Sequence, residues 1–316
     1  MKTYKYALKT GIGRTIEFER KGLSQFGITC GIKCGNGCLY CYMSSLLRMH
    51  PAFVKISKNP FESGYAIVDP DMPNRVVRDA LRKRHRGMVQ LCTFGDAWAQ
   101  EAVQYDIGRR CLEAVLSQPD WNIRILTKNS IVAKDFDVIE RYSDRILFGM
   151  SITSTPDKAS LTTTIEPNAS SISDRIAVMN EAHECGFRTY AMLCPLLPGI
   201  ADSPDQIEQL VKSAVEYGAQ EIFAEPVNSR GPALKITQET LANYGYKDEA
   251  AAIKSIRNQK GWSRYTSRLI SNVQRSVRKL SDISRLKFLL YPSRLTEEDT
   301  TRIKQDDAGV IWLGKS

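Results

Sequence analysis

FRTYAMLCPLLPGIADSPDQIEQLVKSAVEYGAQEIFAE, residues 187 to 225, contains one complete strand–helix–strand unit. Its apolar ends, Phe187–Cys194 and Gln220–Glu225, predict two strands. The middle, Pro204–Tyr217, predicts a helix, because its apolar residues recur at helical spacing: Ile207, Leu210, Val211, Ala214 and Val215. A strand, a helix and a second strand in this order predict a parallel pair joined by a right-handed crossover.

The helix ends in this region carry the expected capping signals. Ser203 can cap the helix that follows it, and Gly218 suits the end of that helix. The preceding helix is expected over Ser171–Cys185, with Ser171 and Asp174 as a capping pair. These signals support the boundaries that the apolar spacing predicts.

The same alternation continues toward the N-terminus. Strands are expected at Leu23–Thr29, Met88–Thr93, Trp121–Thr127, Arg145–Ile152, Phe187–Cys194 and Gln220–Glu225. Helices are expected between them at Tyr42–Arg48, Gln100–Leu116, Ile131–Arg141, Ser171–Cys185 and Pro204–Tyr217. Six successive units without a break predict an α/β protein with an incomplete (β/α)6-type TIM-like barrel rather than two Rossmann halves.

The chain divides into two parts in this interpretation. Residues 1–231 form the partial barrel with its N-terminal segment, and residues 232–316 form a basic, mostly helical C-terminal extension. One further strand is expected in that extension, at Leu286–Tyr291. The pair of glycines at Gly11 and Gly13 is read as a turn, because the rest of a dinucleotide-binding glycine motif is missing.

Composition describes an ordinary globular protein. The chain has 316 residues, of which 42% are hydrophobic and 25% charged, with a mean hydropathy of -0.30. These values exclude disordered, collagen-like and coiled-coil classes. The longest apolar stretch, around Tyr190–Ile200, is too short to span a membrane and is broken by Pro195 and Pro198. No signal peptide is recognisable, so we expect a cytoplasmic protein without a membrane partner.

The charge balance is basic. Lys and Arg number 44 against 35 Asp and Glu, giving a formal net charge of +9. Ten basic residues between Lys254 and Lys287 are interrupted by a single acid, Asp282, and Trp262 and Tyr265 lie among them. This pattern favours a nucleic-acid partner, with the two aromatic residues stacking on bases. A solvated basic face is the alternative.

Four of the eight cysteines fall within twelve residues: Cys30, Cys34, Cys38 and Cys41. A tight cluster in a chain of this length indicates a metal site rather than a disulfide framework. Thiolates suit zinc and iron–sulfur clusters alike. Structural zinc sites usually pair two short cysteine motifs across an intervening segment, whereas these four cysteines share one glycine-rich loop.

The spacing Cys34-x3-Cys38-x2-Cys41, with Tyr40 before the last cysteine, resembles the signature of radical S-adenosylmethionine (SAM) enzymes. The position after the first strand of a (β/α) barrel is similar to that superfamily as well. The resemblance implies that Cys34, Cys38 and Cys41 bind a [4Fe–4S] cluster and that SAM chelates its fourth iron.

Further segments, in order, resemble the spore photoproduct lyase-like (DNA repair photolyase-like) branch of that superfamily. They are Cys38–Tyr42, Leu91–Asp96, Ile123–Lys128, Phe148–Ile152, Glu166–Arg175 and Ala191–Gly199. The resemblance implies that SAM is contacted by Tyr40, Thr93, Asp96, Lys128, Ser151 and Cys194. Glu166 and Arg175 form either a structural ion pair or substrate contacts.

Within Leu91–Asp96, Cys92 corresponds to the lyase's cysteine that returns a hydrogen atom to the product radical. The resemblance therefore implies Cys92 as hydrogen-atom donor, with Tyr40 and Tyr42 as relay partners. It also implies an enzyme that cleaves SAM reductively to a 5′-deoxyadenosyl radical and acts on a DNA lesion, with carbon–carbon lyase chemistry. A flavodoxin or ferredoxin would supply the single electron.

Two alternatives stay open from the sequence. The first keeps the radical chemistry and changes the substrate to RNA, a nucleotide or a peptide. The second is a nucleic-acid-binding protein stabilised by a structural zinc, in which Cys30 completes a four-cysteine site.

Overall fold

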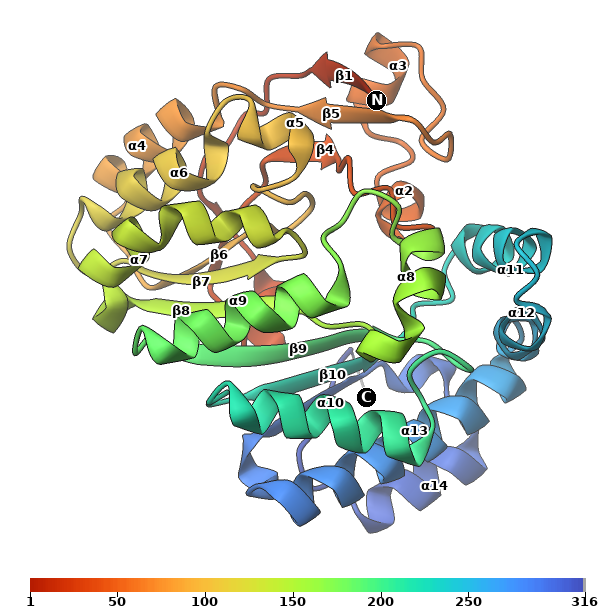
Figure 1. The fold of residues 1–316 in the computed structure, drawn as a ribbon. Helices are drawn as coiled ribbons and strands as arrows, with labels where there is room; N and C mark the ends of the chain where they lie inside the picture. The colour runs from red at the N-terminus through yellow and green to blue at the C-terminus, as the bar shows by residue number, and fades with distance from the viewer. Residues whose placement is uncertain (315–316) are drawn as a thin grey trace.

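The computed structural model describes residues 1–314. A nine-stranded sheet runs through the molecule (Figure 1), and every neighbouring pair from β3 to β12 is parallel. In spatial order the strands are β12 (Val310–Trp312), β11 (Leu286–Leu290), β10 (Ile222–Pro226), β9 (Thr189–Leu196), β8 (Ile146–Ser151), β7 (Asn122–Thr127), β6 (Met88–Leu91), β3 (Phe26–Ile28) and the antiparallel β2 (Gly13–Arg14).

Helices alternate with these strands. They are α1 (Ile16–Arg20), α2 (Met43–Leu46), α3 (Pro51–Lys55), α4 (Met72–Arg82), α5 (Gln100–Val103), α6 (Ile107–Leu116), α7 (Phe136–Arg141), α8 (Ala159–Ile165), α9 (Ile172–Glu184), α10 (Pro204–Glu216), α11 (Ala233–Asn243), α12 (Lys247–Ser255), α13 (Gln259–Leu280) and α14 (Glu297–Gln305). Within residues 1–314, no helix combines the length and apolar character that a membrane crossing needs.

The expectation of a long parallel sheet alternating with helices is confirmed, and all six expected strands are present. The expected number of units is too small, because β11 and β12 continue the same sheet beyond β10. The strand expected at Leu286–Tyr291 is confirmed as β11. Strand β12 has no clear sequence signal, because it has only three residues and follows a polar stretch.

Local helix signals were mostly reliable. Ser203 caps α10 in a complete capping box with Gln206. The helix expected over Gln100–Leu116 is instead two helices, α5 and α6, separated at Asp106, whose φ is +51°. A left-handed residue cannot continue an α-helix, so apolar periodicity alone could not locate this break.

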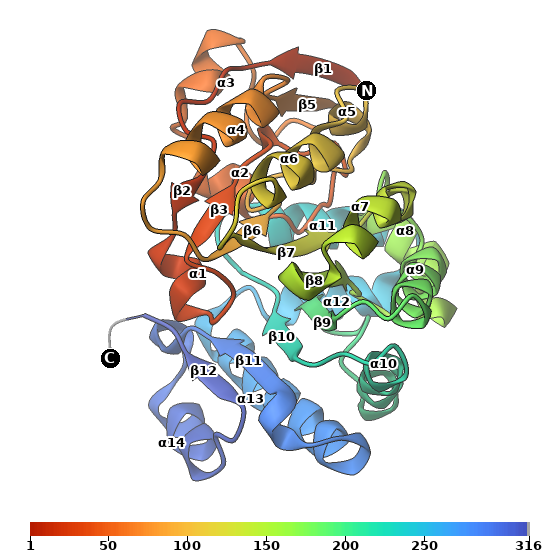
Figure 2. The same cartoon turned by 90° about the vertical axis from the view of Figure 1, so that its left-hand side faces the viewer.

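The sheet has two unlike faces. Its outer face is covered by the helices, as the two views in Figures 1 and 2 show, and holds most of the core. Its inner face carries a smaller apolar cluster with no member from α4 to α14: Leu23, Leu147, Tyr190, Met192, Phe223, Leu289 and Leu313. This arrangement is that of a partial TIM-like barrel, open between its end strands β12 and β2.

One buried arginine fills the inner face near the middle of the sheet. The Arg124 guanidinium donates to the Leu23 carbonyl oxygen at 3.0 Å and to the Glu221 carboxylate at 2.8 Å. It also lies over the rings of Tyr190 and Phe223, 4.6 and 5.3 Å from their centroids. Arg124 therefore fills the inner face at this level with a buried, hydrogen-bonded cation.

A second, three-stranded sheet was not expected. It contains β1 (Lys2–Lys5), β5 (Tyr65–Val68) and β4 (Gly31–Lys33), with β1 parallel and β4 antiparallel to the central β5. Strand β4 ends one residue before Cys34, so this sheet fixes the start of the cysteine loop.

The expected stacking role of Trp262 and Tyr265 is wrong. Their side chains are 3% and 1% exposed, and they donate to the carbonyl oxygens of Val227 and Leu196, respectively. They attach α13 to the ends of β9 and β10 and cannot reach a base. The tertiary structure also pairs part of the basic run with distant acids, as in Arg278 with Asp306 and Lys279 with Glu208.

Gly149 on β8 tests the packing of the inner face. A Cβ at this position would overlap the Tyr190 ring, whose hydroxyl donates to the Ile125 carbonyl oxygen. We expect Gly149→Ala to lower the free energy of unfolding by about 1–3 kcal/mol, because Tyr190 must leave its position.

Urea unfolding checks this expectation, with Gly13→Ala as the matched control. A Cβ at Gly13 has no heavy atom closer than 3.9 Å, so its effect should stay within about 0.5 kcal/mol. Equal stability of the two variants would contradict the packing described here.

Candidate active site

The three cysteines of the loop lie directly after β4, and all three are free thiols. The Cys41 N–H donates to the Cys38 carbonyl oxygen at 3.1 Å, which folds this part of the loop into a tight turn. The Cys34 sulfur accepts a hydrogen bond from the Asn36 N–H at 3.4 Å. Gly37 has a φ of +67°, a conformation that glycine adopts without steric cost.

The loop is held from two sides. The Gly35 N–H donates to Glu101 Oε1 at 2.8 Å, and a Cβ at Gly35 would overlap the other oxygen of that carboxylate. On the opposite side, Leu39 N–H donates to the Ile165 carbonyl oxygen, and Asn168 Nδ2 donates to the Gly35 carbonyl oxygen. Glu101 and Asn168 therefore hold the loop at Gly35 from opposite sides.

Asp96 connects the loop to the ends of β6 and β7. Its buried carboxylate accepts hydrogen bonds from Asn36 Nδ2 (3.2 Å), Thr127 Oγ1 (2.7 Å), Asn129 Nδ2 (2.8 Å) and the backbone N–H groups of Trp98 (3.0 Å) and Lys128 (2.9 Å). These bonds use the acceptor positions of both oxygens. Asp96 therefore joins the loop, through Asn36, to the end of β7.

Glu166 forms a second polar centre, and its side chain is only 1% exposed. Its carboxylate accepts hydrogen bonds from Tyr40, Arg175, Thr153 Oγ1 at 2.8 Å and Lys128 Nζ at 3.2 Å. Burial alone would raise the pKa of this carboxyl group, but the two cations outweigh it and lower the pKa to about 2. Of the two roles expected for Glu166 and Arg175, the structural ion pair is present.

Lys128 belongs to both centres. Its backbone N–H donates to Asp96, its ammonium group donates to Glu166, and it lies 5.7 Å from the centroid of the Tyr40 ring. Burial raises the pKa of the nearby Cys38 thiol to about 12, while the charge of Lys128 acts in the opposite direction. A cation next to the loop favours thiolates and bound anions there.

A third polar group lies on the inner face, at the carboxyl ends of β9 and β10. The Cys194 thiol donates to the Glu225 carboxylate at 3.4 Å, and Lys21 Nζ lies 3.6 Å from the same carboxylate. Lys21 also lies over the ring of Tyr291, 5.5 Å from its centroid. Burial raises the pKa of the neighbouring Tyr42 to about 12, so its hydroxyl keeps its hydrogen.

Cys92 lies elsewhere. Its φ of +75° turns the residue out of the alternation of β6, and it packs against the outer core. Its sulfur accepts a hydrogen bond from the Ala97 N–H at 3.0 Å, and the buried Cys30 is its neighbour. The hydroxyl of Thr93 is engaged with Thr29 at 2.6 Å.

The donor set fits an iron–sulfur cluster. The glycine-rich loop contains three free thiols and lies beside the cation Lys128. Cysteine thiolates are the usual ligands of iron–sulfur clusters. Across residues 1–314, no three His, Cys, Asp or Glu side chains are grouped so as to hold one metal ion. This holds for Cys34, Cys38 and Cys41 as well, so the grouping of side chains does not distinguish a cluster from zinc.

The residues predicted from sequence divide into three groups. Tyr40, Lys128 and Cys38 lie around Glu166, whereas Tyr42 and Cys194 are neighbours near Lys21 and Glu225. Cys92, Thr93 and Asp96 are bonded within the chain on the β3 and β6 side, and Ser151 is buried with its carbonyl oxygen bonded to Arg175.

Sequence reasoning missed Lys21, Asn36, Glu101, Thr153 and Glu225. Glu225 could have been predicted, because it ends an expected strand, and site residues gather at the carboxyl ends of such strands. The others had no local signal, since only the fold brings them to the site.

No protein-family model matches the chain. The curated relatives that match are uncharacterized proteins. One, from Acidianus two-tailed virus, is 22% identical over 243 residues, which cover 75% of this chain and 76% of that protein. Another, from Methanocaldococcus jannaschii, is 22% identical over 246 residues, which cover 77% of this chain and 84% of that protein.

Solved structures give a clearer result. A point mutant of spore photoproduct lyase aligns with a TM-score of 0.60 and 14% identity, covering 88% of this chain and 78% of that one. Spore photoproduct lyase complexed with dinucleoside spore photoproduct aligns with a TM-score of 0.56 and 15% identity, covering 81% and 74%. Over most of its length, this chain has the fold of spore photoproduct lyase, a radical SAM enzyme.

Proposed function

We propose that this protein is a radical SAM enzyme that acts on a nucleic-acid lesion. The observation that carries the proposal is the loop of three free cysteines at the carboxyl ends of a parallel sheet with the fold of spore photoproduct lyase. A dinucleoside lesion bound by that fold supports lesion DNA as the substrate class, and the net charge of +9 supports a polyanionic substrate.

A [4Fe–4S] cluster and SAM would together supply reductive cleavage of SAM to methionine and a 5′-deoxyadenosyl radical. Cys34, Cys38 and Cys41 would hold the cluster, and Lys128 would attract the SAM carboxylate. Glu166 keeps the Lys128 ammonium group at the loop, while Asp96 fixes the backbone beneath it.

The substrate would enter over the inner face. Arg124, Tyr190 and Phe223 fill the interior below, so a nucleotide can reach only the strand ends. There it would meet Lys21, paired with Glu225, together with Tyr42 and Tyr291. A filled interior below the site would help to keep water and oxygen away from a radical.

The first experiment is anaerobic reconstitution with iron and sulfide, followed by dithionite and SAM. We expect 5′-deoxyadenosine well above the level of a Cys41→Ala variant, because loss of one thiolate removes a cluster ligand. Stimulation by ultraviolet-irradiated DNA would support lesion repair, whereas stimulation by RNA or a peptide would assign another substrate. No deoxyadenosine from cluster-loaded protein would contradict the proposal.

Glu166 is expected to be a positioning residue whose charge holds two buried cations. Glu166→Gln leaves Lys128 and Arg175 without a counter-charge, so we expect a loss of about 3–5 kcal/mol in the free energy of unfolding. The matched control is Glu62→Gln, which breaks an exposed pair with Lys58 and should cost less than about 1 kcal/mol.

The pH dependence of this effect has a definite sign. The pKa of Glu166 is lowered from 4.5 to about 2 in the folded chain, so the carboxylate stabilises the fold fully above pH 4.5. That contribution is lost as the pH falls from 4.5 toward 2. The free energies of unfolding of wild type and Glu166→Gln, measured by denaturant titration, should therefore converge as the pH falls through this range. A difference between them that does not change with pH would contradict this role of Glu166.

Hydrogen-atom donation by Cys92 remains a proposal, and Cys185, an exposed free thiol at the C-cap of α9, is its control. If Cys92 is the donor, Cys92→Ala should keep SAM cleavage but lose the correctly quenched product, whereas Cys185→Ala should keep both. Product analysis by mass spectrometry distinguishes the two variants. Unchanged product from Cys92→Ala would contradict the donor role.

A further inference from the structure

A surface of mixed apolar and basic character lies beside the cysteine loop. It is formed by Leu46, Arg48, Met49, Val54 and Lys55 and is called here the α2–α3 surface. The side chains of Met49 and Val54 are 83% and 81% exposed, and Leu46 is 45% exposed. Met49 and Val54 are the two most exposed large hydrophobic residues among those described, so this surface is unlike the rest.

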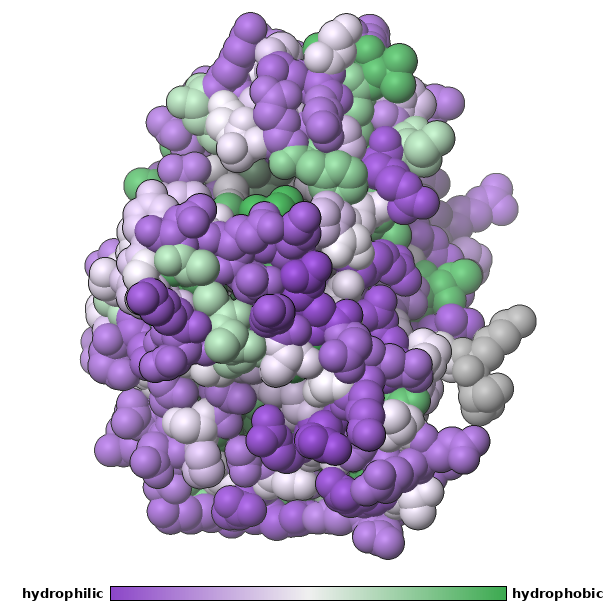
Figure 3. Space-filling model, turned by 90° about the vertical axis from the view of Figure 1, so that its right-hand side faces the viewer, coloured by the Kyte–Doolittle hydropathy of each residue, from purple (hydrophilic) through white to green (hydrophobic). Residues whose placement is uncertain are grey.

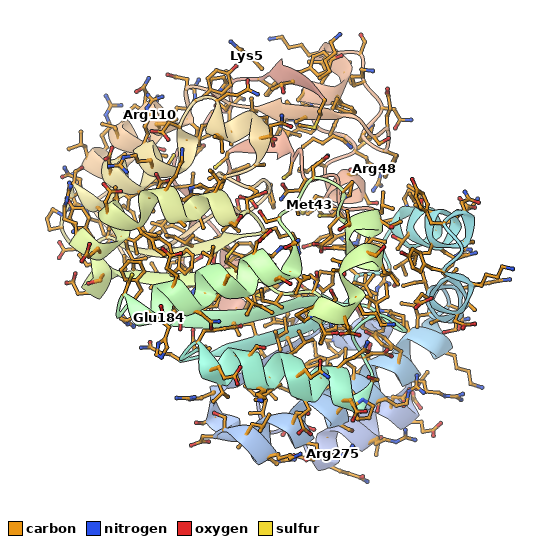
Figure 4. All side chains as sticks on the ribbon, in the orientation of Figure 1. Lys5, Met43, Arg48, Arg110, Glu184 and Arg275 are labelled. Atoms are coloured by element: carbon orange, nitrogen blue, oxygen red, sulfur yellow. The ribbon has the colours of Figure 1, made fainter. Side chains whose placement is uncertain are left out.

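Figures 3 and 4 show where this surface lies. Figure 3 presents the right-hand side of Figure 1, and hydrophobic patches interrupt the hydrophilic surface in its upper part, where α3 lies. In Figure 4, Arg48 lies in the upper right part of the molecule, close to Met43 at the start of α2. The surface is therefore open to a macromolecule approaching from this side.

The segment of the chain that carries this surface is positively charged. The sequence contains no Asp or Glu from Arg20 to Phe61, although this stretch includes Lys33, Arg48, Lys55 and Lys58. Lys58 is paired with Glu62, while Arg48 and Lys55 form no ion pair with any carboxylate in residues 1–314. These two charges remain available for an external acidic partner.

The same surface is continuous with the proposed cluster ligands. Tyr42, the residue after Cys41, is the N-cap of α2. Cys41 is the exposed member of the three cysteines, whereas Cys34 and Cys38 are partly buried. Of the three cysteines, Cys41 is therefore both the most exposed and the nearest in the chain to the α2–α3 surface.

We propose that the α2–α3 surface docks an acidic one-electron carrier protein, so that electrons enter through the side of Cys41. This inference rests on the proposed function, since a cluster must be present to receive the electron. The step is a simple transfer: the reduced carrier loses one electron, the cluster gains it, and no bond forms or breaks.

The composition of the surface favours a protein over nucleic acid. Methionine and arginine are enriched at protein interfaces, where an apolar centre is surrounded by charge. Single-stranded nucleic acid instead needs aromatic platforms for its bases, and the three exposed apolar residues are aliphatic. Charge complementarity to an acidic carrier would accelerate encounter and set the docking orientation.

The test compares two double variants in cluster-loaded protein. Arg48→Glu with Lys55→Glu reverses the charge of the surface. Arg82→Glu with Arg84→Glu is the matched control, because both arginines are exposed, form no ion pair among residues 1–314, and precede β6 at the opposite end of the sheet. Cluster bleaching by reduced flavodoxin is followed by stopped flow, and flavodoxin binding to cluster-free protein is measured by calorimetry.

We expect the first variant to slow reduction by flavodoxin by about tenfold or more at low ionic strength, and to weaken binding in parallel. Its reduction by dithionite and its dithionite-driven deoxyadenosine formation should be unchanged. Added salt should lower the rate of cluster reduction in wild type toward that of the variant, because salt screens the charges that attract flavodoxin. The control variant should behave like wild type.

Three results would overturn the docking inference. They are an unchanged rate in Arg48→Glu with Lys55→Glu, an equal loss in the control variant, and a loss of DNA binding without any change in flavodoxin reduction. In each case dithionite-driven deoxyadenosine would persist, so the proposed function would stand. Failure of wild type with dithionite would instead contradict the proposed function, and the docking inference with it.

Discussion

The candidate site depends on the buried carboxylate of Glu166 and the cations that it holds. Taking a carboxylate out of water is costly unless it is paired and hydrogen-bonded, and Lys128, Arg175, Tyr40 and Thr153 meet that requirement together. These partners come from the cysteine loop, the ends of β7 and β8, and α9. The hydrogen bond from Tyr40 to Glu166 therefore links the loop to the sheet, and the ionic contact with Glu166 holds Lys128 beside the loop.

The partition of the sheet into two faces explains why thiols of similar sequence context have different surroundings. Cys92 directly follows β6, and Cys194 lies near the carboxyl end of β9. The left-handed backbone at Cys92 turns it toward Cys30 and the outer core, whereas Cys194 keeps the alternation of β9 and contacts Glu225 on the inner face. Side-chain direction along a strand follows the backbone, and a single positive φ reverses it.

The N-terminal segment gives the molecule its asymmetry. Its small sheet leads into the cysteine loop on one side, and α2 and α3 follow that loop with exposed aliphatic and basic side chains. The inner face is available to a substrate from the strand ends, while the α2–α3 surface is available from outside. In the proposed function, the loop between them would receive an electron from the α2–α3 surface and serve a substrate at the inner face.

The alternation of strands and helices, the parallel sheet and the cysteine loop are all predictable from the sequence, because each depends on residues close together in the chain. Apolar spacing around Ile207 and the Ser203 cap are examples. The burial of Trp262 and Tyr265, the contact of Lys21 with Glu225 and the pairing of β12 with β11 become visible only in the folded chain. These outcomes depend on contacts between distant segments, and neither periodicity nor charge runs contain information about which distant residue will lie opposite.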